Sequence, residues 1–262
     1  MKKLHSLLLG ATLAALTSCA GQVYHVDAGA MFVKASGHIS LQNSTNGLAL
    51  FQNKNDFDNH LGVDDIEPSP YLRLQADQDR HRVRLHGLGI DNKGSGTLAD
   101  NGSPPNSNGF GDIPGGSQVT TSLRFFAAGL TYAYEVARDE NYRFAVGAAL
   151  NFYALDVAAR SLTTRESVQT SVLVPMPYVE VEGFLGPVTA GVNAGAMSAD
   201  LGDANGRYVD AEGYLRWQAV DDFDVMVGYR YLVMDAAGNA SGRDFDADLY
   251  LQGFFVGGGV RF

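Results

Sequence analysis

Charged side chains in this sequence recur at alternate positions, and that spacing suits ion pairing inside a narrow interior. Arg82 and Arg84 are two residues apart, and so are Glu180 and Glu182. Side chains at positions i and i+2 of a β-strand point to the same face. Opposite charges on facing strands would pair, because a buried charge without a partner is costly. The residues expected to line such an interior are Arg73, Arg82, Arg84, Arg124, Arg143, Glu180, Glu182, Asp210, Glu212 and Arg230.

A second group of residues has the types needed for acid–base chemistry. His38, His60, Asp64 and Asp65 lie in the polar stretch 36–67. An Asp–His pair activates water when the two side chains lie within hydrogen-bonding reach. The sequence contains neither a G-x-S-x-G nucleophile motif nor an H-E-x-x-H metal motif. Solvated loop residues are the simpler interpretation. We therefore expect no enzymatic activity, with a hydrolase as the alternative.

Cofactor and metal sites are not expected either. Cys19 is the only cysteine, so no disulfide and no multi-cysteine metal site can form within the chain. The segment 53–59 brings several side-chain oxygens together, but it lacks the glycine and terminal glutamate of an EF-hand loop. We favour an ordinary hydrated loop over a calcium site. The formal net charge of −10 argues against nucleic acid, whose phosphates require a basic surface.

The elements that position these residues are predicted to be β-strands. Apolar and polar residues alternate along segments such as 223–233, and 31 glycines and 8 prolines punctuate the chain. Strands are predicted near 22–35, 68–76, 80–93, 118–137, 142–159, 168–185, 187–199, 206–219, 222–236 and 245–262. Tight polar turns, such as Gln78-Asp79 and Asp221-Asp222, alternate with longer connections, especially 36–67 and 94–117.

Three places interrupt the alternation. Around Phe126 to Tyr134 the apolar residues switch between odd-numbered and even-numbered positions. Leu249 and Leu251 lie on the strand face opposite to that of Phe254. A bulge or glycine kink at each place would restore the pattern. The prolines at 175 and 177 lack backbone donors within a predicted strand, which places them at a rim or a bulge rather than in a regularly paired segment.

The last strand carries the most informative pattern. Phe254, Val256, Val260 and Phe262 share one face, and Arg261 lies on the other. This pattern resembles the closing strand of bacterial outer-membrane β-barrels. The resemblance implies an antiparallel up-and-down transmembrane β-barrel of about ten strands, with eight as the alternative. It also implies that Phe262, Val260 and Phe254 form part of an assembly signal read by the barrel-assembly machinery. The implied location is the bacterial outer membrane, and the other implied partners are lipid, a secretion translocon and periplasmic chaperones.

The first residues are predicted to be a processing segment. Lys2 and Lys3 precede a short apolar run that is too short to span a bilayer as a helix. Residues 16–19 resemble a lipobox, which would end the signal peptide at residue 18 and make Cys19 the lipidated first residue of a lipoprotein. The alternative is a signal of residues 1–20, cleaved before Gly21. Residues 19–262 are then a single barrel domain of a Gram-negative cell envelope.

Two functions fit a barrel lined by mixed charges. The favoured one is a structural or surface-exposed envelope protein, whose lumen is filled by paired charges. The alternative is a narrow channel or binding protein for small polar solutes, with Arg82, Arg84, Arg124, Glu180, Glu182 and Glu212 as lining candidates. A barrel of about ten strands leaves much less bore than porins of 16–18 strands, so general diffusion is not expected. The sequence does not indicate the oligomeric state.

Overall fold

The computed structural model describes residues 22–44, 54–100, 108–201, 204–240 and 242–262. The predicted signal peptide and Cys19 lie outside the described residues. No helix among the described residues is long and apolar enough to cross a membrane.

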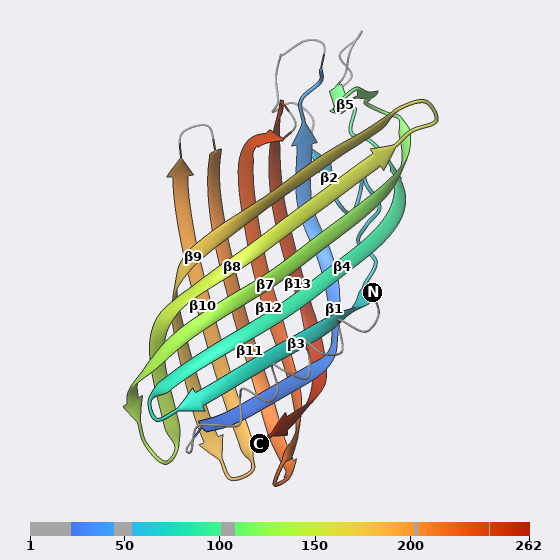
Figure 1. Cartoon of the computed structure of the whole chain (residues 1–262). Helices are drawn as coiled ribbons and strands as arrows, with labels where there is room; N and C mark the ends of the chain where they lie inside the picture. Colours follow the sequence, from blue (N-terminus) through green and yellow to red (C-terminus); the bar gives the residue numbers. More distant parts are fainter. Residues whose placement is uncertain (1–21, 45–53, 101–107, 202–203, 241) are drawn as a thin grey trace, which may run out of the picture.

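Ten long antiparallel strands form one closed ring (Figure 1). They are β1 (Gln22–Leu41), β3 (Glu67–Gln78), β4 (His81–Thr97), β7 (Gln118–Arg138), β8 (Tyr142–Arg160), β9 (Arg165–Leu185), β10 (Val188–Leu201), β11 (Ala204–Val220), β12 (Phe223–Ala240) and β13 (Arg243–Arg261). Each strand pairs with the next along the ring, and β1 closes it against β13, from His25↔Arg261 to Leu41↔Phe245. The predicted all-β barrel of about ten strands is confirmed.

The two ends of the barrel differ in their connections. One end carries tight turns at 79–80, 139–141, 186–187 and 221–222, together with the start of β1 and the end of β13. By the usual arrangement of outer-membrane barrels this is the periplasmic end, and the opposite end is called the outer end here. The outer connections after β8 and β12 are shorter than predicted, because the strands that flank them extend further outward.

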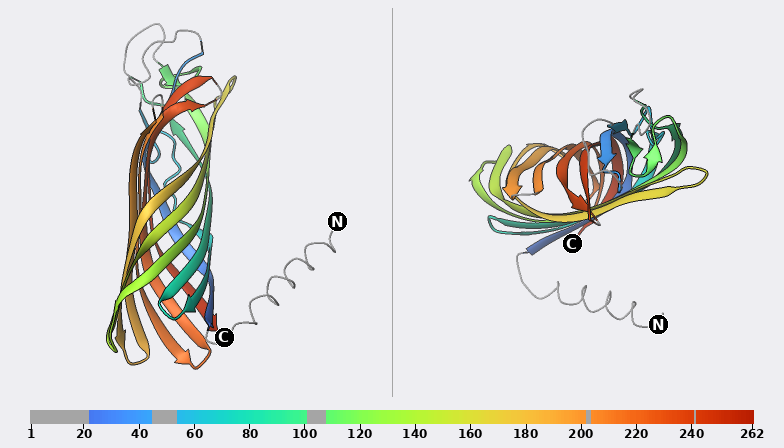
Figure 2. Two further views of the ribbon diagram at one scale, coloured as in Figure 1. Left: turned by 60° about the vertical axis from the view of Figure 1, so that its left-hand side comes forward. Right: turned by 90° about the horizontal axis from the view of Figure 1, so that it is seen from above.

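Three short strands lie in the two long outer connections. They are β2 (Asn55–Asp56), which pairs with the outer part of β1, and β5 (Asn108–Phe110) with β6 (Ile113–Pro114), which form a small hairpin. Figure 2 shows the β5–β6 hairpin at the outer end of the ring, and the ring is flattened when seen from above.

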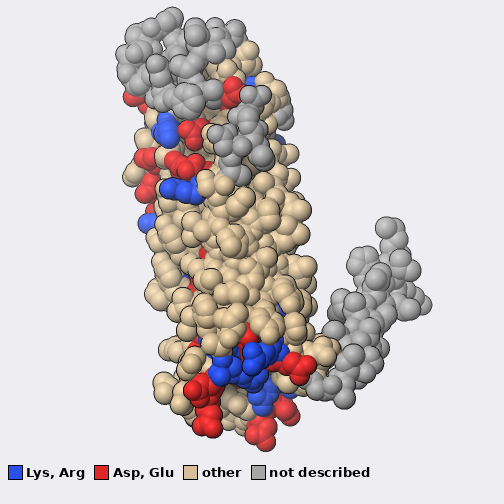
Figure 3. Space-filling view, turned by 90° about the vertical axis from the view of Figure 1, so that its left-hand side faces the viewer, with Lys and Arg blue, Asp and Glu red and all other residues tan. Residues whose placement is uncertain are grey.

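The exterior carries an apolar belt. On β13 the side chains of Phe254, Val256 and Val260 are 44–69% exposed, whereas Phe255 is 2% exposed. The same alternation runs around the ring, so bulky apolar residues face outward from neighbouring strands. Figure 3 shows a broad uncharged zone between a charged outer zone and a charged periplasmic zone. Lipid is the surrounding that such a belt requires.

The interior is apolar at its outer half and charged at its periplasmic half. Leu123, Phe125, Leu249 and Leu251 all point inward and are at most 2% exposed. Leu249 and Leu251 do oppose the face of Phe254, but the bulge or glycine kink predicted near Phe126 and near Leu249 is wrong. These strands keep a strict alternation there, and both of their faces are apolar. The register shift of the β7–β8 pair lies elsewhere, between Glu135 and Ala137.

The prolines of β9 lie where β9 is no longer paired with β10. Pairing of β9 with β10 ends at Tyr178↔Gly195, although both strands continue toward the outer end. On its other flank β9 pairs with β8 without interruption, and Pro175 and Pro177 face Leu150 and Ala148. The expected bulge is thus absent, and the prediction that these residues escape regular pairing is wrong for the β8 flank. The flank toward β10 is unpaired there, so missing backbone donors are tolerated on that side.

Candidate functional site

The centre of the charged half is an ion pair between Arg73 of β3 and Glu212 of β11. Both side chains are buried, and these strands lie on opposite sides of the ring. The hydroxyl of Tyr71 donates to Glu212 Oε2 at 3.2 Å. The guanidinium of Arg73 lies 5.2 Å from the ring centroid of Tyr214. A buried charge pair is favourable only when further contacts of this kind satisfy it.

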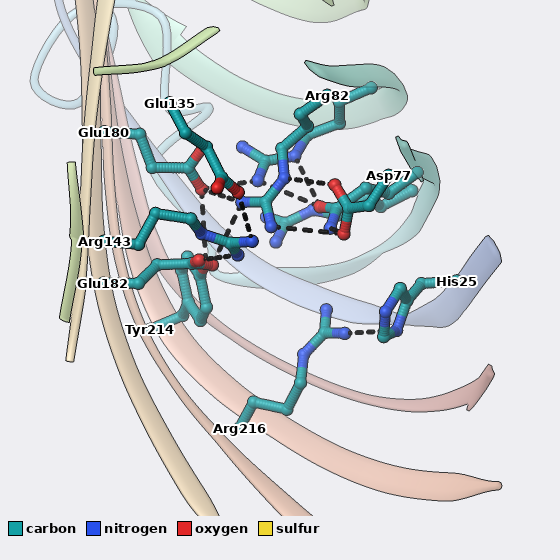
Figure 4. A network of polar contacts seen from close by, with 12 residues as sticks. His25, Asp77, Arg82, Glu135, Arg143, Glu180, Glu182, Tyr214 and Arg216 are labelled. Atoms are coloured by element: carbon teal, nitrogen blue, oxygen red, sulfur yellow. Dashed lines mark hydrogen bonds and ion pairs between the residues drawn. The ribbon is translucent and has the colours of Figure 1, made fainter. Parts of the chain in front are cut away.

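A four-residue network lies next to this pair and joins β4 to β9 (Figure 4). Arg82 donates to Glu180 at 2.9 Å and to Glu182 at 3.2 Å. Arg84 donates to Glu180 at 2.6 Å and to the hydroxyl of Tyr178 at 2.6 Å. The i and i+2 spacing of both pairs places each pair on one strand face, as the sequence indicated.

Further pairs extend the network toward both ends. Arg143 donates to Glu135 at 2.8 Å and also pairs with Glu182. At the level nearer the outer end, Arg230 donates to Asp210 Oδ1 at 2.9 Å and contacts His86 Nε2 at 2.9 Å. The pairs of Arg143 with Glu135 and Glu182, and of Arg230 with Asp210, join neighbouring strands. The contact of Arg230 with His86 joins β12 to β4 across the interior.

A separate cluster at the periplasmic end contains two aspartates and one arginine. Arg216 Nη2 donates to Asp27 Oδ2 at 2.7 Å, and Nη1 lies 3.5 Å from Asp224 Oδ2. The Oδ1 atoms of both aspartates are buried and have no hydrogen-bond partner. They lie 2.2 and 2.6 Å from the point where a Cβ would stand on Gly259, so only glycine permits their convergence.

The interior leaves little free space. The cavity enclosed at its centre has a volume of about 30 Å³ and is lined by residues that include Arg73, Arg84, Asn151 and Arg230. This volume suffices for one or two water molecules. A vestibule of about 410 Å³ opens at the periplasmic turns, with Arg82, Arg143 and Arg216 among its lining residues.

The outer mouth is filled by apolar side chains from the long connections. The mouth cluster consists of Phe57, Leu61, Val63, Leu98, Phe110 and Ile113, each at most 2% exposed. These residues pack into one apolar core with inward-facing residues of the strands, such as Ile39 and Phe125. The backbone of Phe57 donates to Gly37 of β1, and that of Gly111 donates to Leu41.

All of the predicted lining residues except Arg124 lie in the interior. Arg124 lies on the outer surface, with its side chain 61% exposed and 3.5 Å from Asp91. The prediction failed because Leu123 and Phe125 occupy the inward positions of β7. Sequence reasoning omitted Asp27, a short acidic residue between Val26 and Ala28 whose partner lies 189 positions away.

The two histidines considered for acid–base chemistry lie beside different aspartates. His38 Nε2 lies 2.7 Å from Asp248 of β13, and His60 Nδ1 lies 3.4 Å from Asp56. Neither histidine has Asp64 or Asp65 among the ion-pair partners found within the described residues. The hydrolase alternative stays a hypothesis.

Comparisons with known proteins identify the fold. No family model matches the sequence, and no curated protein does. The solved structure of the outer membrane protease OmpT from Escherichia coli is similar, with 10% identity, coverage of 93% of this chain and 97% of that chain, and a TM-score of 0.60. Ail of Yersinia pestis (9% identity, coverage 92% and 99%) and Neisserial surface protein A (11%, 93% and 98%) have TM-scores of 0.39 and 0.34, too low to carry an argument. The chain has the fold of the bacterial outer-membrane β-barrels, and its apolar belt is that of a protein lying in the outer membrane.

Proposed function

We propose that this protein is a sealed outer-membrane barrel with a structural or surface-exposed envelope role. The observation that carries the proposal is the small cavity volume at the centre of the described part of the barrel. The interior cavity of about 30 Å³ is separated from the outer end by the mouth cluster. A solute larger than water has no room in that cavity.

The charged residues support the same function because they are paired with one another. Glu180, for example, accepts from both Arg82 and Arg84, and its side chain is 1% exposed. A conducting pore presents charges to water and to permeating ions, whereas these groups are buried and neutralise each other. The network acts as a polar core that holds the two walls of a narrow barrel together.

The rigid barrel would hold its outer segments above the membrane. The strands contain up to 21 residues, about twice the 9–11 that cross a bilayer. The β8–β9 hairpin and the β5–β6 hairpin therefore project beyond lipid. Delivery by a translocon, periplasmic chaperones and the barrel-assembly machinery belongs to this proposal.

Single-channel recording on refolded protein tests the proposal. We expect the wild-type barrel to leave a planar lipid bilayer electrically silent across a range of voltages. The matched control is a single protein that carries Arg73→Ala and Glu212→Ala and also lacks residues 54–66. The two substitutions remove the central ion pair, and the deletion removes part of the mouth cluster. Stepwise conductance of the wild type would overturn the proposal. Conductance of the control alone would show that the assay detects an opened lumen.

The periplasmic vestibule favours a second candidate function, the binding of a small polar solute. It is lined by side chains of both charges, including Arg143 and Glu182, and its volume of about 410 Å³ accommodates a small molecule. Thermal-shift measurements with amino acids and phosphate esters test this candidate. Ligand-dependent stabilisation that disappears in Arg143→Gln would support it, and no shift with any solute would reject it.

A further inference from the structure

Three potential metal ligands converge on the outward face of the rim. His38 of β1 and Asp246 and Asp248 of β13 each offer one ligand atom, and these atoms lie within 4.8 Å of one another. His38 is the register partner of Asp248, and Ser40 is that of Asp246. The three side chains are therefore placed by paired strands and not by a loop. Their side-chain exposures of 14–23% show that they are shielded from bulk water.

A cation already lies among these ligands. The ammonium of Lys54 is 2.5 Å from His38 Nε2, 3.4 Å from Asp246 Oδ2 and 3.8 Å from Asp248 Oδ2. His38 Nε2 also lies 2.7 Å from Asp248 Oδ2. One ring nitrogen cannot donate to a carboxylate and accept from an ammonium at the same time. The arrangement is that of three acceptors directed at one positive centre.

The surroundings add negative charge to this group. Asp235 of β12 is the register partner of Asp248, and its other register partner is Arg207 of β11. The Asp235 carboxylate lies 3.7 Å from Arg207, whose side chain is 58% exposed. Three carboxylates thus share the charges of one lysine and one exposed arginine. A divalent ion would neutralise the group more completely than the single ammonium does.

We propose that His38, Asp246 and Asp248 form a binding site for a divalent ion of the zinc class, which Lys54 occupies as a tethered cation until metal displaces it. One imidazole and two carboxylates match the nitrogen and oxygen donors that zinc accepts. Calcium, by contrast, takes six to eight oxygen ligands. Small rotations of the three side chains bring their atoms to bonding distance, and water completes the coordination. This inference goes beyond the sealed-barrel function and is independent of it.

Zinc titration of the refolded full-length protein, free of any histidine tag, tests the site. Equilibrium dialysis against Zn²⁺ alone measures affinity and stoichiometry. We expect His38→Ala and Asp248→Asn each to weaken binding at this site by at least about tenfold. Lys54→Met should strengthen it by roughly tenfold, because the competing charge is removed. The visible spectrum of bound Co²⁺ gives an independent signature, whose intensity reports low coordination number.

Two controls distinguish this site from nonspecific binding. His60→Ala removes the other rim histidine, which has an aspartate at 3.4 Å, and should leave the affinity unchanged. Lys93→Met removes a lysine from β4 and should also leave it unchanged. Equal affinity in the wild type, His38→Ala and Lys54→Met would overturn the proposal. Loss of binding in His60→Ala with retention in His38→Ala would move the site elsewhere and would overturn it too.

Discussion

Arg73 of β3 and Glu212 of β11 pair across the barrel interior, with only 2% and 5% of their side chains exposed. Three other strands, β1, β13 and β12, separate β3 from β11 along the ring. The pair is therefore a cross-lumen contact and not a feature of one sheet ladder. Its burial makes the fold sensitive to the loss of either partner.

Loss of one partner should destabilise the barrel strongly. Glu212→Gln leaves the Arg73 guanidinium buried without a counter-charge, and we expect a loss of about 3–5 kcal/mol. The double variant Arg73→Met/Glu212→Leu leaves no unpaired charge and should cost less than Glu212→Gln alone. Urea unfolding in detergent, followed by tryptophan fluorescence, measures both. Arg124→Met, on the exposed exterior, is the control and should change stability by less than about 0.5 kcal/mol. A lower free energy of unfolding for the double variant than for Glu212→Gln would contradict this prediction.

The second prediction concerns the two aspartates that share Arg216. Asp27 is the nearer partner, at 2.7 Å against 3.5 Å for Asp224, and the two carboxylates exceed the single guanidinium in charge. Asp224→Asn removes the surplus charge, so we expect unchanged or slightly greater stability. Asp27→Asn removes the closer ion pair and should destabilise by about 3 kcal/mol. The same urea titration compares them, and equal losses in both variants would refute the assignment.

The third prediction concerns the point where the pairing of β9 with β10 ends, at Tyr178↔Gly195. Val179 faces outward like Pro177, but β9 is paired on both flanks at that position. Val179→Pro removes a ladder hydrogen bond and should prevent folding or cost about 3 kcal/mol or more. Pro177→Val restores a donor on a flank where β10 is not paired, and should change stability little. Heat-modifiable migration on gels reports the folded fraction. A folded, stable Val179→Pro barrel would contradict the pairing described here.

The sequence predicted the strands well because two local signals agreed. Apolar and polar residues that alternate with a period of two indicate a strand with one apolar and one polar face, as in β12 from Phe223 onward. Tight polar turns such as 221–222 then mark the periplasmic end. Arg82, Arg84, Glu180 and Glu182 were placed correctly for the same reason, since each pair lies on one face of an alternating strand.

Where both faces are apolar, the sequence loses this signal. Leu123 and Phe125 point inward while Phe126 points outward, so hydrophobicity alone does not distinguish the two faces of β7. That ambiguity placed Arg124 inside and suggested a bulge near Leu249. The mouth cluster was not predicted because its residues come from connections that read as hydrated loops. The Asp27–Arg216 contact joins residues 189 positions apart, and no local pattern indicates it.

The fourth prediction concerns pH at the outer rim. The hydroxyl and backbone N–H of Ser44 donate to Asp112, and these hydrogen bonds hold the pKa of the Asp112 carboxyl below its ordinary value. A lowered pKa means that the contact stabilises the fold above the ordinary value of about 3.9 and loses this effect as pH falls through the folded-state pKa. Ser44→Ala should move the pKa of Asp112 upward, toward that ordinary value. Carboxyl carbon NMR of the refolded protein measures it, and an unchanged titration would rule out the Ser44 hydroxyl as a cause.

The fifth prediction separates the packing of Phe262 from its expected part in an assembly signal. Its backbone exchanges hydrogen bonds with Tyr24, at 2.9 and 3.1 Å, and the two rings stack with centroids 5.8 Å apart. Phe262→Ala and Tyr24→Ala remove the same stack, which is worth about 1 kcal/mol, so both should refold in detergent with similar small losses. The resemblance to outer-membrane barrels implies that only Phe262→Ala also weakens the assembly signal. Membrane insertion in cells should therefore fall in Phe262→Ala and not in Tyr24→Ala, and equal insertion of the two variants would argue against a signal at Phe262.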